Sequence, residues 1–163
     1  GGGILYDGGS YAVTTARFLF GAEPSRAVML VDPDPANGVD RTVSALVEFP
    51  SGQASFVASQ ALVYYQRVQI LGTEGRIDIE IPFDSTGEKP CNLFLSDSTF
   101  DEGTIATEAV APVDQYTLQA ELFSEAIRKG NPQPVPLENS IGNMRVIDAL
   151  FRSAKSGGWE SIR

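Results

Sequence analysis

The chain has 163 residues, of which 42% are hydrophobic, and this predicts one globular domain with one ordinary core. A formal net charge of -9 offers no basic patch for phosphate backbones or anionic lipids, so we expect neither a nucleic-acid nor a membrane partner. Cys91 is the single cysteine and histidine is absent, which excludes an internal disulfide and removes imidazole from every mechanism. Carboxylates, Tyr, Lys and Ser remain for chemistry, and we expect no metal site.

The start of the chain shows no signal-peptide pattern, and no window approaches the ~18 apolar residues of a membrane span. We therefore expect a cytoplasmic protein. An opening Gly1-Gly2-Gly3 without an initiator Met indicates a fragment or a processed chain.

Helical periodicity begins soon after these glycines. A helix is predicted over residues 8–21 because apolar positions recur on one face and Gly21 and Pro24 close the run. Two further helices are predicted over 114–130 and 141–157, each ended by glycine.

The middle of the chain has strand periodicity. Strands are predicted over 26–31, 42–49, 54–63, 65–71 and 76–81, with short edge strands at 93–95 and 104–109. Turn formers at 50–53 and 72–75 join neighbouring strands into hairpins. Hairpins in the middle with helices at both ends predict an α+β fold, a largely antiparallel open sheet with helices packed on one face.

Several predicted strands are apolar on both sides, as in Ala45-Leu46-Val47 and Phe56-Val57-Ala58. A sheet covered on one face only would leave the other face for a partner, and we expect a homo-oligomer through that open face. Two alternatives stay open: the face assignment is one residue out, or the strands bury both faces within one copy.

The predicted first helix has an acid and a phenol near its start. Asp7 and Tyr11 are four residues apart, so both can lie on one helix face. Taken alone, Asp7 is better interpreted as a helix N-cap and Tyr11 as a core aromatic residue than as functional residues.

A series of motifs in a fixed order resembles one protein family. The chain opens with the pattern GGGxLxDxGxYxxxxxRFLFG and continues through Glu23-Pro24, Val39-Asp40, Phe49-Pro50-Ser51-Gly52, residues 72–77 (GTEGRI), Ile81-Pro82-Phe83, residues 123–127 (FSEAI) and residues 145–150 (RVIDAL). This order is similar to the C-terminal domain of the Gfo/Idh/MocA oxidoreductases, the family of glucose-fructose oxidoreductase, inositol dehydrogenase and dihydrodiol dehydrogenase. The resemblance covers nearly the whole chain and favours the branch that includes dihydrodiol and xylose dehydrogenases.

The resemblance implies a two-domain enzyme in which an N-terminal Rossmann domain binds NAD or NADP. Residues 1–163 would be the C-terminal substrate-binding and oligomerisation domain, with the fold of the C-terminal domain of glyceraldehyde-3-phosphate dehydrogenase. The chain itself has no G-x-G-x-x-G between a strand and a helix. We expect no cofactor bound to this chain, no Rossmann domain in it, and no activity from it alone.

The resemblance also implies roles for Asp7 and Tyr11 as catalytic residues. Hydride would leave a carbinol carbon for nicotinamide while the hydroxyl proton passes to a base. A tyrosine ordinarily keeps its proton at neutral pH, so Tyr11 would need a nearby cation, such as a lysine of the absent domain. Many family members have histidine at the position of Tyr11, and tyrosine there favours an aldose or related carbinol substrate over inositol.

Other polar residues are weaker substrate-binding candidates: Arg17, Gln60, Tyr64, Tyr65, Arg67 and Tyr116. Arg17 can equally orient the helix or pair with an acid, Tyr116 can be core, and the others can simply be solvated. Glu88-Lys89-Pro90 matches the family's catalytic tripeptide but follows the Asp7 motif, so Lys89 is interpreted as a solvated loop residue.

Two classes of function follow from these predictions. The first is half of an NAD(P)-dependent sugar-type dehydrogenase. The alternative is a non-catalytic binding or oligomerisation module of the same fold, because fold alone does not decide function.

Overall fold

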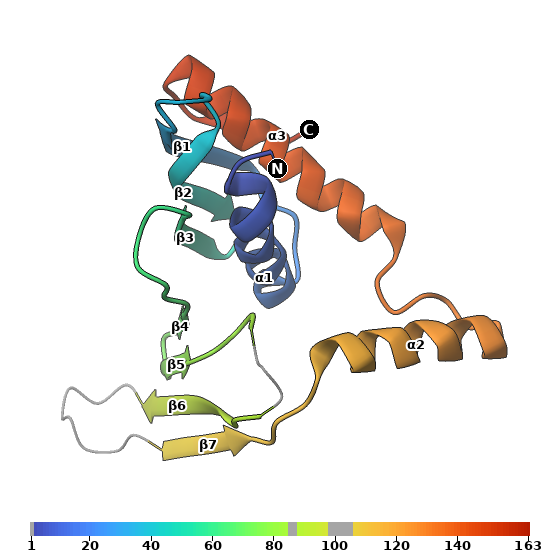
Figure 1. Ribbon diagram of the computed structural model, residues 1–163. Coiled ribbons are helices and arrows are strands. Elements are labelled where there is room, and N and C mark those ends of the chain that lie inside the picture. The colour runs from blue at the N-terminus through green and yellow to red at the C-terminus, as the bar shows by residue number, and fades with distance from the viewer. Residues whose placement is uncertain (1, 85–87, 98–105) are drawn as a thin grey trace. The chain divides into compact units, whose positions relative to one another are not determined.

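The computed structural model describes residues 2–84, 88–97 and 106–163 (Figure 1). They form two compact units. Unit 1 comprises Gly1–Val63 and Val135–Arg163, and unit 2 comprises Tyr64–Pro134. The assignment of residues 1–163 to one substrate-binding and oligomerisation domain stays a prediction.

Unit 1 is built from one antiparallel sheet and the helices that cover it. The helices are η1 (Leu5–Gly9), α1 (Ser10–Phe20) and α3 (Leu137–Ser156), and the strands are β1 (Arg26–Pro33), β2 (Asp40–Phe49), β3 (Gly52–Ser59) and β8 (Glu160–Ser161). The strand order is β3-β2-β1-β8, and every neighbouring pair is antiparallel. The predicted first helix starts earlier than expected, at Leu5, and the short strand β8 has no counterpart in the sequence prediction.

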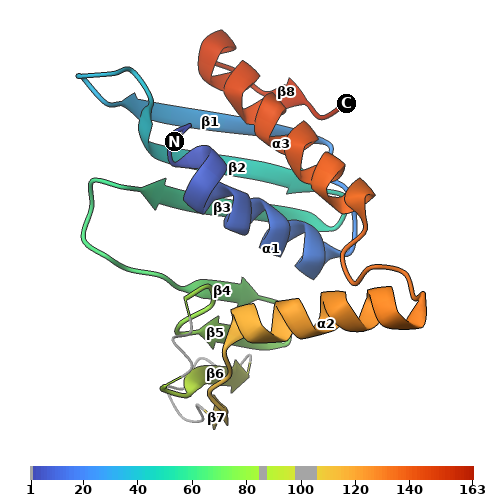
Figure 2. The ribbon, with the colours of Figure 1, turned by 45° about the vertical axis from the view of Figure 1, so that its right-hand side comes forward.

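The core of unit 1 lies between the sheet and the helices. Val43, Ala45, Val47 and Phe49 alternate along β2 and are buried, as a strand with one covered face requires. They pack with Leu5, Val13, Met29, Val146, Ile147 and Leu150, among others. Figure 2 shows α1 and α3 lying on the same face of this sheet. The predicted arrangement of helices on one sheet face is therefore confirmed.

The other face of this sheet carries apolar side chains as well. Val28 pairs with Leu46, and Ser44 pairs with both Leu30 and Val57, so these residues share the face that the helices leave uncovered. Leu30, Leu46 and Val57 are exposed. We call Val28, Leu30, Leu46 and Val57 the open-face patch.

Unit 2 has a second antiparallel sheet and one helix. The elements are β4 (Val68–Leu71), β5 (Gly75–Ile79), β6 (Cys91–Asp97), β7 (Ala106–Val110) and α2 (Gln115–Lys129), with strand order β4-β5-β6-β7. The hairpin predicted at residues 72–75 is present, closed by a 2.9 Å bond from the Gly72 amide to the Gly75 carbonyl.

The α+β class and the antiparallel pairing are thus confirmed, with one difference in detail. The sequence predicted one open sheet, whereas the described strands form two four-stranded sheets. The pairing stops because β3 ends at Ser59 and β4 begins only at Val68, and most of the intervening residues are exposed without ladder partners. The described helices include none that is long and apolar enough to cross a membrane.

Candidate functional site

The motif that carries Asp7 folds as a single π-helical turn that runs directly into α1. The turn, η1, is closed by a 2.9 Å hydrogen bond from the Gly9 amide to the carbonyl of Ile4, five residues back. Single π-helical turns are rare in proteins, and those that occur often lie at functional sites. Asp7 and Tyr11 therefore lie on one continuous helical segment, with Asp7 in the π-turn and Tyr11 just after it.

Asp7 lies inside the first turn of this segment and is exposed. It does not cap the helix, because Ile4 occupies the N-cap position and no side chain near it in sequence accepts a capping bond there. The N-cap interpretation of Asp7 is wrong for this reason. A carboxylate in the first turn still interacts favourably with the helix dipole.

Tyr11 is 51% exposed, so it is not the core aromatic residue that the alternative interpretation described. The core face of α1 is formed instead by Val13 and Ala16. An exposed acid and a half-exposed phenol at the start of one helix can exchange a proton with a bound molecule.

The start of this helix is held by a residue that sequence reasoning did not select, Asp40. Its carboxylate Oδ2 accepts the Leu5 amide at 2.6 Å, and its backbone carbonyl accepts the Ile4 amide at 2.9 Å. From the sequence, Asp40 is named only within the motif Val39-Asp40. No local pattern identifies the contact, because the two partners are 35 residues apart.

Arg17, a candidate substrate-binding residue, lies on the buried face of α1. Its Nε donates to Glu23 at 2.9 Å, and its Nη1 donates to the Asn139 carbonyl at 2.9 Å and to Asn143 Oδ1 at 2.6 Å. The hydrogen bond from Arg17 lowers the pKa of Glu23. Arg17 thus pairs with an acid and connects its helix to α3, as the alternative interpretation described. Substrate binding by Arg17 stays a prediction.

The other candidates do not share the helix of Asp7 and Tyr11. Gln60 is exposed in unit 1, just after β3, whereas Tyr64, Arg67 and Tyr116 are exposed in unit 2. The Tyr64 hydroxyl donates to Asp84 at 3.0 Å, and this bond raises the pKa of Tyr64. Their role in substrate binding stays a prediction.

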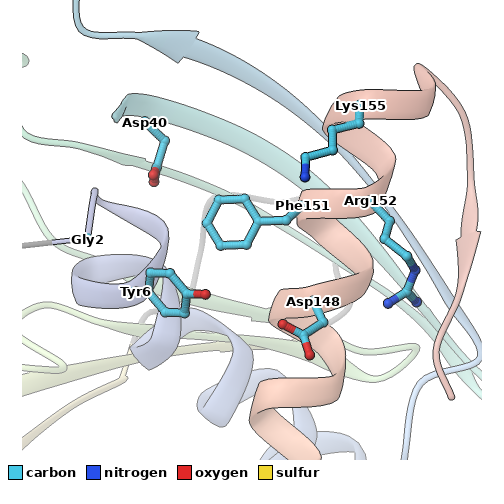
Figure 3. A pocket seen from close by; sticks show the side chains of 7 residues that line it. All are labelled: Gly2, Tyr6, Asp40, Asp148, Phe151, Arg152 and Lys155. Atoms are coloured by element: carbon cyan, nitrogen blue, oxygen red, sulfur yellow. The ribbon is translucent and has the colours of Figure 1, made fainter. Parts of the chain in front are cut away.

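Unit 1 has an open pocket of about 560 Å³ beside the start of η1 (Figure 3). It is lined by Gly2, Tyr6, Asp40, Asp148, Phe151, Arg152 and Lys155. The rings of Tyr6 and Phe151 lie 5.2 Å apart, and Arg152 also donates to the Ser161 carbonyl at 2.7 Å. Asp7 and Tyr11 are not among the lining residues.

Two other features bear on cofactors and metals. Lys89 is exposed between β5 and β6, in the polar setting expected for a solvated loop lysine. Within the described ranges, no three Cys, Asp or Glu side chains gather closely enough to hold a metal ion.

Comparison with known proteins identifies the class of this chain. Residues 1–78 match the family model described as the GFO/IDH/MocA C-terminal domain. An uncharacterized oxidoreductase of Rhizobium meliloti is 45% identical over 164 residues, covering 99% of this chain and 49% of that protein. The D-xylose 1-dehydrogenase (NADP(+)) 2 of Haloferax volcanii is 32% identical and is matched over 96% of this chain and 47% of its own length.

The fold comparison agrees with the sequence comparison. The crystal structure of aldose-aldose oxidoreductase from Caulobacter crescentus, complexed with glycerol, matches 98% of this chain and 48% of that chain, with a TM-score of 0.84 and 26% identity. The chain belongs to the Gfo/Idh/MocA family of oxidoreductases. It spans about half the length of the curated relatives it matches.

Proposed function

We propose that this chain is the substrate-binding and oligomerisation domain of an NAD(P)-dependent dehydrogenase. The reaction would move hydride between nicotinamide and a carbinol carbon of a sugar-type or related diol substrate. The supporting observation is the continuous helical segment that exposes Asp7 in its π-turn and leaves Tyr11 half exposed. The named relatives that act on aldoses agree with this substrate class.

The residues of this chain do not fit a dinucleotide cofactor. A helix N-terminus preceded by glycines is a common site for a pyrophosphate group. Here the amide of Leu5, at the first position of η1, already donates to the Asp40 carboxylate, and that negative charge would repel a phosphate. We therefore propose that this chain is part of a longer protein, since it spans 49% and 47% of two relatives, and that residues outside this chain hold NAD or NADP.

Asp7 and Tyr11 would supply the acid-base chemistry. When a carbinol is oxidised, its carbon gives a hydride to the nicotinamide, and the hydroxyl proton passes to the oxygen of Tyr11, which could accept it only as the phenolate that a nearby cation would stabilise. The Asp7 carboxylate would orient the sugar hydroxyls by accepting their hydrogen bonds and would stabilise positive charge nearby. Arg17, Gln60, Tyr64, Arg67 and Tyr116 remain proposed substrate-binding residues of lower priority.

The test of this proposal follows the hydrogen itself. The longer protein that contains this chain is incubated with NAD or NADP and with aldoses deuterated at C1, and the reduced nicotinamide is analysed by mass spectrometry. The proposal predicts one deuterium transferred to the nicotinamide for each aldose oxidised. Reduced nicotinamide without deuterium would contradict oxidation at C1, and no reduction with any aldose or diol would support the alternative of a non-catalytic module.

We also propose that two copies associate through the open-face patch. The apolar side chains of β1, β2 and β3 that the helices leave uncovered favour burial against another surface of the same kind. Replacement of Leu30 and Val57 by lysine would place two charges in that interface and favour the monomer.

The oligomer is tested by light scattering after gel filtration. Leu62→Lys is a matched control, because Leu62 and Val57 are each 64% exposed but Leu62 lies outside the sheet. A Leu30→Lys/Val57→Lys protein that keeps the wild-type mass would contradict the proposed interface. The cytoplasmic location stays a prediction from sequence.

A further inference from the structure

We propose that Asp40 is a positioning residue for the helical segment formed by η1 and α1. Its carboxylate fixes where η1 begins and therefore where Asp7 and Tyr11 lie. This inference rests on the function proposed above. Asp40 is the first residue of β2, directly after the turn of the β1–β2 hairpin, and is only 7% exposed. Figure 3 shows the Asp40 carboxylate directed toward the start of η1.

The first contact is a helix cap supplied from a distant part of the chain. The first amides of a helix have no partner within the helix and need one from outside. Here Asp40 satisfies two of them, with its backbone carbonyl on Ile4 at 2.9 Å and its carboxylate on Leu5 at 2.6 Å. The negative charge also lies at the positive end of the helix dipole, which favours a helix that begins at this point.

The second contact is steric and involves Gly3. The φ angle of Gly3 is +91°, and a Cβ added there would lie 1.8 Å from Asp40 Oδ1. The backbone before η1 therefore passes against the carboxylate so closely that only glycine fits. Asp40 thus holds three successive residues: its backbone carbonyl bonds Ile4, and its carboxylate bonds Leu5 and packs against Gly3.

The consequence for the site follows from helix geometry. Asp7 is two residues after Leu5 and Tyr11 is six, and both belong to the segment that starts at the Asp40 contact. If the cap is lost, the first turn frays and the two side chains lose their fixed positions. A misplacement of about 1 Å at a reacting group can cost roughly 100-fold in rate.

The test compares Asp40→Ala, Asp40→Asn and Asp34→Ala in the longer protein. Asp34 is the matched control because it belongs to the same β1–β2 connection and its carboxylate also accepts a backbone amide, that of Ala36 at 2.8 Å. We expect Asp40→Ala to lower kcat by roughly 100-fold with little change in KM. Asp40→Asn keeps an oxygen that can accept the Leu5 amide and should recover part of the loss, whereas Asp34→Ala should keep the wild-type kcat.

A second pair of variants leaves the carboxylate in place and changes the glycine. Gly3→Ala would press on Asp40, whereas Gly38→Ala has a similar positive φ of +75° with no atom within 4 Å of the added carbon. We expect Gly3→Ala to lower kcat as Asp40→Ala does, and the double variant to add little, because both break one contact. Equal effects of Gly3→Ala and Gly38→Ala would overturn the steric part of the argument.

Hydrogen exchange of backbone amides separates this inference from the proposed function. Asp40→Ala should speed exchange in residues 4–11 at least about tenfold, as expected for the loss of a hydrogen bond to a charged group, while Asp34→Ala should not. Unchanged exchange in that segment, or a folded Asp40→Ala protein with wild-type kcat, would overturn the inference. Faster exchange in a protein whose wild type oxidises no carbinol would support the capping role and overturn the proposed function instead.

Discussion

The two ends of the helical segment formed by η1 and α1 differ in what they present to their surroundings. At the N-terminal end Asp7 is exposed and Tyr11 is half exposed. At the C-terminal end Arg17 is buried, with its guanidinium bonded to Glu23 and to two asparagines of α3. Both ends of the segment are thus held, by Arg17 at one end and by Asp40 at the other, but only the N-terminal end presents Asp7 and Tyr11 at the surface.

This difference predicts that substitutions at the two ends change different properties of the protein. Substitutions of Asp7 and Tyr11 should lower activity and leave the free energy of unfolding nearly unchanged, because neither side chain is buried. Changes at the C-terminal end should lower the free energy of unfolding first.

Asp7→Asn should have a large effect on activity. Removal of the charge takes away an electrostatic contact with the reacting group, and we expect kcat/KM to fall about 100-fold. The melting temperature should stay near that of the wild type because Asp7 is exposed. Steady-state kinetics and thermal unfolding measure the two quantities.

Asp148→Asn is the control for Asp7→Asn. Asp148 lines the pocket beside η1 and does not belong to the helical segment of Asp7 and Tyr11. We expect its kcat/KM to stay within about twofold of the wild-type value, as for most surface substitutions. The reverse order of effects would place the chemistry in the pocket and not at Asp7.

Arg17→Met should have the largest effect on stability. The substitution keeps much of the apolar stem but removes the buried hydrogen bonds to Glu23 and α3, and we expect a loss of about 2–3 kcal/mol in the free energy of unfolding. Urea denaturation measures the loss. Arg26→Met, which breaks an exposed pair with Glu48, should cost less than about 1 kcal/mol. A similar cost for both would mean that burial does not strengthen the Arg17 network.

Gly21→Ala tests the end of α1 itself. Gly21 has a φ of +57°, and its amide donates to the carbonyls of Arg17 and Phe18. A Cβ there meets no atom within 4 Å, so the cost is conformational, about 1 kcal/mol. Gly21→Asn should lose less, because asparagine tolerates the left-handed region. Equal losses in the two variants would contradict this explanation.

Acid should weaken the contact between Arg17 and Glu23. The hydrogen bond from Arg17 lowers the pKa of Glu23 from 4.5, so the unfolded state takes up a proton first as the pH falls. The contribution of Glu23 is fully present above about pH 5 and decreases below pH 4.5. The stability difference between wild type and Glu23→Gln should therefore shrink from pH 5 to pH 3 in thermal unfolding. A difference that stays constant over this range would contradict the lowered pKa.

The sequence predicted the elements with strong periodicity and strong turn signals. β2, with Val43, Ala45, Val47 and Phe49 on one face, and the hairpin at Gly72 to Gly75 lie where the patterns placed them. The gap between β3 and β4 was missed, because the apolar residues at 61–65 resemble strand residues although they make no ladder.

The start of the first helix was missed for a different reason. Local signals place a helix start at Gly8, since the glycines at the start of the chain have low helix propensity and Asp7, directly before Gly8, is a common N-cap residue. The real start at Leu5 depends on the carboxylate of Asp40, which only the fold brings close. Asp7 and Tyr11 were selected by resemblance to a family, while the residue that holds their helix required the structure.

The most direct test of the central claim compares the two tyrosines of the motif. Tyr6 and Tyr11 are 46% and 51% exposed, but only Tyr11 is assigned the proton of the carbinol hydroxyl. In the longer protein with NAD(P) and its best aldose, the account predicts that Tyr11→Phe lowers kcat/KM by roughly 100-fold to 10,000-fold. Tyr6→Phe should leave it nearly unchanged. Equal activity of Tyr11→Phe and wild type would contradict the account.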